Sequence, residues 1–123
     1  MTFLTDRKRA RGMGSAKTGT HQHWNMTISS AALLVLVPLF VFTFGPMLGR
    51  PHAEVVDYFG HPFPAIVAAL TIAVGFVHFK NGVQVLIEDY VHGLAGKVLI
   101  IAMICVSYGA AATGIFAIAK IAL

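Results

Sequence analysis

Three long apolar runs constrain this chain more than any other feature of its sequence. They cover about residues 26–48, 63–87 and 97–121 of 123, and most charged side chains lie outside them. A helix of about 20 apolar residues crosses the hydrocarbon core of a bilayer, where charge is costly. The apolar fraction of 57% is also too high for a soluble domain of this size. The sequence therefore predicts an all-α integral membrane protein with three transmembrane helices.

The basic residues are concentrated near the N-terminus. Residues 1–25 carry five of the nine lysines and arginines and one acid, whereas the connector 49–62 carries one base and two acids. Because positive charge stays on the cytoplasmic side, or on the matrix side in a mitochondrion, the basic segment marks that side of the membrane. We expect a cytoplasmic segment 1–25, a transmembrane domain 26–123 in a bacterial inner membrane, and a periplasmic C-terminus. The N-terminal bases are Arg7, Lys8, Arg9, Arg11 and Lys17. They indicate the topology of the protein or contact with lipid headgroups, and no nucleic-acid partner is expected.

Local features refine the three spans. Pro38 predicts a kink in the first run, which a membrane helix with packed neighbours tolerates. Charges and turn formers predict a polar loop at 49–62. In the third run, small residues one helical turn apart indicate packing faces: Ala110 with Gly114, and Ser107 with Ala111.

His78 is the most informative residue, because it lies near the middle of the second predicted helix. Lipid offers an imidazole no hydrogen-bond partner, so a histidine at this depth requires a local reason. Three functional interpretations fit: a haem ligand, a proton relay, or a site for a transported metal. The structural interpretation is a hydrogen bond to a neighbouring helix.

The predicted helix face around His78 favours the haem. Gly75 and Gly82 share this face, three residues before and four residues after the histidine. The two glycines leave space for a flat macrocycle, although they could equally admit another helix. A proton relay would more naturally place carboxylates or hydroxyls there.

A haem b held by two imidazoles needs a second histidine. The other five histidines of the chain lie in polar flanking segments: His21, His23, His52, His61 and His92. The second ligand must then come from another polypeptide or a symmetry copy. Since three helices cannot enclose a porphyrin, we expect the chain to be one subunit of a larger assembly.

Three of the polar residues that follow His78 along the same helix have a functional interpretation. Tyr90 lies 12 residues later, about 18 Å along the helix, and so near the membrane surface. It is either an aromatic-belt anchor or a phenol that donates a hydrogen bond to a quinone carbonyl. Asp89 either orients that phenol or is a solvated charge. Lys80 either snorkels to the surface or meets a haem propionate.

The run from His78 to Gly93, HFKNGVQVLIEDYVHG, resembles the second-helix signature of the D-type hydrophobic membrane anchor subunits of succinate dehydrogenase. That signature is a histidine, a glycine four residues later, and an Asp-Tyr pair eleven and twelve residues after the histidine. It is met by His78, Gly82, Asp89 and Tyr90. The segment 14–24, GSAKTGTHQHW, is similar to the start of the same subunits, and the resemblance covers about residues 7–120.

The resemblance implies roles for these residues. His78 would be an axial ligand of haem b, with the other ligand on a second, larger anchor subunit. Tyr90 would hydrogen-bond ubiquinone close to an iron–sulfur subunit, supported by Asp89. Succinate, an intermediate of the tricarboxylic acid cycle, would be oxidised at FAD in a flavoprotein subunit, and iron–sulfur clusters would carry the electrons to ubiquinone. The chain would be a non-catalytic subunit of that complex.

One position departs from the family pattern, and other functions stay open. Many relatives carry an arginine six residues after the histidine that corresponds to His21, where this chain has Thr27. Any contact made by that arginine is therefore in doubt here. The alternatives are a cofactor-free structural anchor or assembly subunit, the anchor of a related fumarate reductase, and a small transporter with a midplane proton site.

Overall fold

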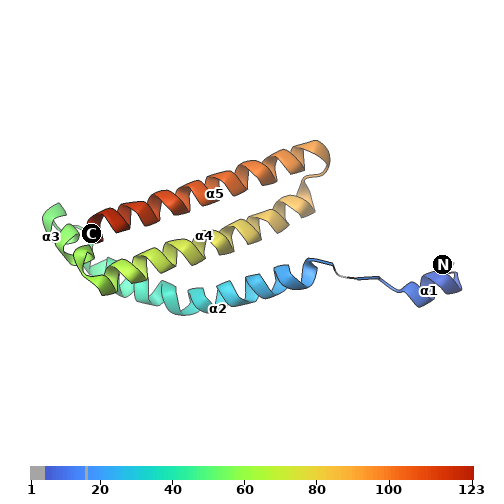
Figure 1. The fold of residues 1–123 in the computed structure, drawn as a ribbon, viewed down its shortest axis with the longest axis horizontal. Helices are drawn as coiled ribbons and strands as arrows, with labels where there is room; N and C mark the ends of the chain where they lie inside the picture. The colour runs from blue at the N-terminus through green and yellow to red at the C-terminus, as the bar shows by residue number, and fades with distance from the viewer. Residues whose placement is uncertain (1–4, 16) are drawn as a thin grey trace.

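The computed structural model describes residues 5–15 and 17–123, and it is all-α over these residues. Residues 1–4 of the expected N-terminal segment, and Ala16 within the GSAKTGTHQHW segment, lie outside the described residues. Three described helical segments are long and apolar enough to cross a membrane. They are α2 (Gly19–Phe44) continued by the 3-10 turn η1 (Gly45–Met47), α4 (Pro62–Tyr90) and α5 (Gly93–Ala122). The prediction of an all-α protein with three transmembrane helices is confirmed (Figure 1).

Helix α4 runs antiparallel to α2 and α5, and the helix ends are grouped at two poles (Figure 1). The start of α2, the end of α4 and the start of α5 lie at one pole, which we call the Tyr90 end. The C-terminus, η1 and the short helix α3 (His52–Gly60) lie at the other. Two crossings, by α2 and α4, therefore place residues 91–92 at the same end as the start of α2, and the third, by α5, places the C-terminus at the other.

Proline and glycine set the limits of α4. Pro62 stands in its first turn, where the missing N–H is not needed and the fixed φ suits a helix. After Tyr90 the backbone turns extended at Val91 and His92. Gly93 then adopts a φ of +73°, a conformation that glycine reaches at little cost. The chain thus reverses within a few residues, and α5 returns beside α4.

The central helix is α4, which packs against both α2 and α5. Against α5 the close approach depends on small residues, since Ser107 and Ala111 are buried there. A Cβ built on Gly114 would lie only 3.2 Å from methyl groups of Ile72. The third span therefore uses its small residues for helix packing, as lipid-embedded helices commonly do.

The connector between the first two spans is not the polar loop that its charges suggested. It contains helix α3, whose Phe59 is buried and whose Val55 and Val56 are half-buried. The Phe59 ring lies 6.2 Å from the ring of Phe44. An amphipathic helix at the membrane surface can cover the ends of the spanning helices with its apolar face, and α3 contacts both α4 and α5.

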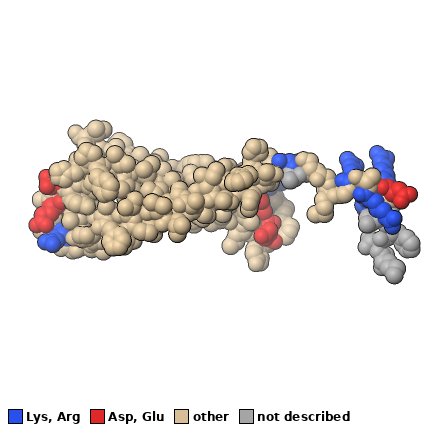
Figure 2. Space-filling view, turned by 90° about the horizontal axis from the view of Figure 1, so that it is seen from below, with Lys and Arg blue, Asp and Glu red and all other residues tan. Residues whose placement is uncertain are grey.

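The helices also extend beyond the predicted spans. Helix α2 begins at Gly19 rather than near residue 26 and continues through Pro38. Helix α4 reaches Tyr90 rather than residue 87, and α5 begins at Gly93 rather than residue 97. Hydropathy marks the part of a helix that meets lipid, whereas the backbone hydrogen bonds continue into the polar interface. In the view of Figure 2, Lys, Arg, Asp and Glu gather toward the ends and leave a long uncharged middle.

Candidate functional site

The site centres on His78, which lies on α4 beside α2. The hydroxyl oxygen Oγ of Ser29, on α2, is 2.9 Å from Nδ1 of the His78 ring. Ser29 is buried and His78 is half-buried. Because α2 and α4 run antiparallel, two residues 49 positions apart in the chain meet inside the membrane-spanning part of the molecule. The contact is the interhelical hydrogen bond that was one of the open interpretations of His78.

The two ring nitrogens of His78 differ in their surroundings. Nδ1 faces Ser29, whose Oγ also lies 2.8 Å from the carbonyl oxygen of Asn25 and 3.0 Å from that of Met26. Nε2 has no hydrogen-bond partner within residues 5–15 and 17–123. One nitrogen is therefore held by the fold, and the other is available to a ligand.

The two glycines near His78 have different neighbours. A Cβ built on Gly75 would meet no atom within 4 Å, so the helix surface is open there. A Cβ on Gly82 would lie 3.8 Å from Cε of Met26 on α2. Gly82 thus borders the neighbouring helix, whereas Gly75 borders free space.

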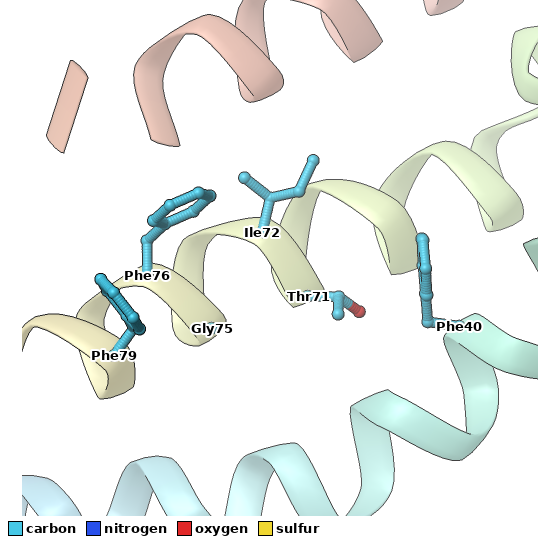
Figure 3. Close-up of a pocket in the computed structure, with 6 residues that line it drawn as sticks. All are labelled: Phe40, Thr71, Ile72, Gly75, Phe76 and Phe79. Atoms are coloured by element: carbon cyan, nitrogen blue, oxygen red, sulfur yellow. The ribbon is translucent and has the colours of Figure 1, made fainter. Parts of the chain in front are cut away.

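Gly75 lines an open apolar pocket of about 330 Å³ between α2 and α4. In Figure 3, Phe40 rises from α2 toward α4, while Ile72 and Phe76 point toward α5. The remaining lining residues come from α4: Thr71 and Phe79. The Thr71 hydroxyl donates a hydrogen bond to the carbonyl of Val67, so it adds no free polar group to the pocket.

A second apolar pocket, of about 410 Å³, lies beside Ser29 and is lined by Val74 and Val77 of α4. Successive residues on a helix are about 100° apart, so Val77 and Phe79 project to opposite sides of His78. The histidine therefore stands on α4 between two apolar hollows, one lined by Val77 and the other by Phe79. Such surroundings suit an apolar planar group better than a solvated ion.

A polar pocket of about 270 Å³ lies nearer the Tyr90 end. Its residues were not predicted from the sequence to lie together, although the spacing of the α4 members at i, i+1 and i+4 is a usable signal. Lys80 is half-buried there and forms no ion pair with any acidic side chain in the described part of the chain. The pocket is lined by Thr18, His21, Gln22 and Asn25 from α2, and by Lys80, Asn81 and Gln84 from α4.

Tyr90 is the last residue of α4, and its side chain is 79% exposed. Asp89 is exposed as well, and no hydrogen bond joins it to Tyr90 among the described side chains. Just before this pair on α4, Gln84 Nε2 donates a hydrogen bond to Glu88 Oε1 at 2.9 Å. Tyr90 thus presents its phenol at the end of α4, about 18 Å along the helix from His78.

Thr27, where the family resemblance led us to expect an arginine, is exposed on α2. Its hydroxyl donates to the carbonyl of His23, at 3.0 Å, within the same helix. Among the described residues, no group of three or more His, Cys, Asp or Glu side chains is placed to hold a metal ion.

The chain is similar to a set of known membrane subunits. A family model described as succinate dehydrogenase/fumarate reductase transmembrane subunit matches residues 1–116. The succinate dehydrogenase hydrophobic membrane anchor subunit of Paracoccus denitrificans is 41% identical over 123 residues, covering 100% of this chain and 95% of that one. The subunit of the same name from Rickettsia conorii (strain ATCC VR-613 / Malish 7) is 29% identical over 103 residues, covering 80% of this chain and 81% of the other. No solved structure matches the chain significantly.

Proposed function

The chain belongs to the family of succinate dehydrogenase/fumarate reductase transmembrane subunits, and from this premise we propose that it is the smaller hydrophobic anchor of a succinate:ubiquinone oxidoreductase. In this role it tethers a soluble flavoprotein and iron–sulfur head to the membrane. It also provides one half of a haem b site and part of the ubiquinone site. Oxidation of succinate itself takes place in the head, so the chain is a non-catalytic subunit.

His78 is the proposed axial ligand of the haem iron. The observation that carries this assignment is the contact of its ring: Nδ1 is engaged by Ser29, whereas Nε2 has no hydrogen-bond partner among the described residues. The residues on either side of His78 in the sequence, Val77 and Phe79, line two apolar pockets. A neutral imidazole nitrogen is a common haem-iron ligand, and the open surface at Gly75 leaves space beside it. The residues around His78 therefore fit a bound haem. When bound, haem b supplies a one-electron carrier close to the quinone.

The exposed apolar surface supports a second membrane subunit as the source of the other ligand. Large apolar side chains point outward from α2 and α5, including Leu34, Phe42, Val106 and Phe116, each at least 69% exposed. Lipid covers some of this surface, and a second anchor subunit covers the part next to His78. The other five histidines of the chain are exposed and lie near helix ends, so they do not compete for the site.

Tyr90 is the proposed hydrogen-bond donor to ubiquinone. Reduction of the quinone adds two electrons and two protons, and negative charge develops on its oxygens as electrons arrive. A phenol donates more strongly to an oxygen that carries such charge, so it favours the reduced form. The adjacent Asp89 can accept a hydrogen bond at the same surface. The Tyr90 end is then cytoplasmic, in agreement with the basic N-terminal segment.

The haem assignment is tested by the reduced-minus-oxidised absorbance spectrum of the purified complex. His78→Ala should remove the b-type absorbance while the subunits still purify together. The matched control is His52→Ala, which changes an exposed histidine in α3 at the opposite end and should leave the spectrum unchanged. An unchanged b-type spectrum in His78→Ala would instead support a cofactor-free anchor.

A further inference from the structure

We propose that Ser29 is the positioning residue for His78. Its hydroxyl accepts a hydrogen bond from Nδ1–H, which fixes the ring and its tautomer so that the Nε2 lone pair faces the iron. This inference rests on the proposed haem ligand and deepens it. It assigns a defined role to a buried serine on a different helix.

The tautomer follows from counting hydrogen bonds. The Ser29 hydroxyl has one hydrogen and three neighbours: two backbone carbonyls, which only accept, and Nδ1 of His78. With the proton on Nδ1, the ring donates to Oγ and the hydroxyl donates to a carbonyl, which makes two hydrogen bonds. With the proton on Nε2, the hydroxyl donates to Nδ1, and the Nε2–H finds no acceptor in the described part of the chain. Away from water the first arrangement is favoured.

The hydroxyl is itself held in place from two sides. The carbonyls of Asn25 and Met26 orient Oγ, and Ser29 is only 6% exposed. One turn toward the Tyr90 end, Met26 of α2 lies beside Gly82 of α4, where a Cβ built on the glycine would be 3.8 Å from Cε of the methionine. The serine therefore couples the histidine ring to a fixed point on α2.

Other hydroxyls on the spanning helices lack such a partner. Ser30, Thr71 and Thr113 each donate to a carbonyl four residues earlier in their own helix. Among the described hydroxyls, only that of Ser29 also forms a hydrogen bond with a side chain on another helix. Ser30 is thus a matched control, since its hydroxyl donates to the carbonyl of Met26 at 2.8 Å without contacting His78.

The bond should affect the electronic properties of the haem. A hydrogen bond from the outer nitrogen of a ligating imidazole makes the imidazole a stronger electron donor. A stronger donor stabilises the ferric iron and lowers the midpoint potential of the haem. Removal of the Ser29 hydroxyl should therefore raise that potential, an effect that a purely structural serine would not produce.

The experiment compares Ser29→Val with Ser29→Thr in the purified complex, since valine and threonine have similar shapes and differ in the hydroxyl. Haem content, midpoint potential and the low-spin ferric EPR spectrum are measured. Ser29→Val, and Ser29→Ala beside it, should raise the midpoint potential and change the EPR g-values, or lose haem from an assembled complex. Ser29→Thr and Ser30→Ala should keep the parent values.

Two results would overturn the inference. One is a haem-containing Ser29→Val or Ser29→Ala complex with the parent potential and EPR spectrum. The other is a failure of both hydroxyl-free variants to assemble, because the hydroxyl would then serve helix packing. The absence of a b-type spectrum from the parent complex would refute the proposed function itself, which distinguishes the two failures.

Discussion

At the residue scale, the two ring nitrogens of His78 have different surroundings. Nδ1 of His78 lies 2.9 Å from Oγ of Ser29 across the contact of two helices, and Nε2 has no hydrogen-bond partner among the described residues. His78 could be identified from the sequence by its depth in an apolar run. Ser29 could not, because helical periodicity shows which residues share a face but not which residues of two helices lie level with each other.

Tyr90 gives the residue-scale prediction for the quinone site. Tyr90→Phe removes the phenol hydroxyl and should slow succinate-dependent ubiquinone reduction about 10-fold, the loss expected for one hydrogen bond to an oxygen that gains charge. Succinate oxidation by a soluble artificial acceptor should persist, because the flavin and the clusters are untouched.

Tyr58→Phe is the matched control for Tyr90→Phe. Tyr58 lies on α3 at the opposite end of the molecule. Both assays are run on the parent complex and on each variant. Equal ubiquinone reduction rates in Tyr90→Phe and the parent would remove the phenol from the mechanism.

At the element scale, the spanning helices were predictable and the surface helix was not. Runs of more than 20 apolar residues have few alternatives to a transmembrane helix, so the three spans follow from hydropathy alone. Helix α3 has only a few apolar positions, Val55, Val56 and Phe59, among charged neighbours. Its formation depends on burial against the ends of α4 and α5, which is tertiary information.

The packing of α5 on α4 also gives a prediction. Gly114→Leu should lower the melting temperature of the complex or its yield, because a Cβ at this position already lies 3.2 Å from Ile72 and a larger side chain would separate the helices. Gly109→Leu is the matched control on the same helix, where a Cβ meets nothing within 4 Å. Similar thermal unfolding curves for the two variants would show that Gly114 does not limit the helix approach.

At the scale of the whole molecule, the chain has the surface expected of a membrane subunit that packs against lipid and other subunits. Its spanning helices expose large apolar side chains, and its charges gather toward the ends (Figure 2). The candidate haem ligand, the polar pocket and Tyr90 follow one another toward the same end of α4. A soluble head docked at the Tyr90 end would place its electron carriers next to the quinone.

The most direct test of the account is a cryo-EM map of the intact complex at a resolution that shows side chains. We expect density connecting Nε2 of His78 to a haem iron, a second histidine from the partner anchor on the opposite face, and the soluble head at the Tyr90 end. A map in which His78 faces lipid, or in which the porphyrin is held without it, would contradict the account.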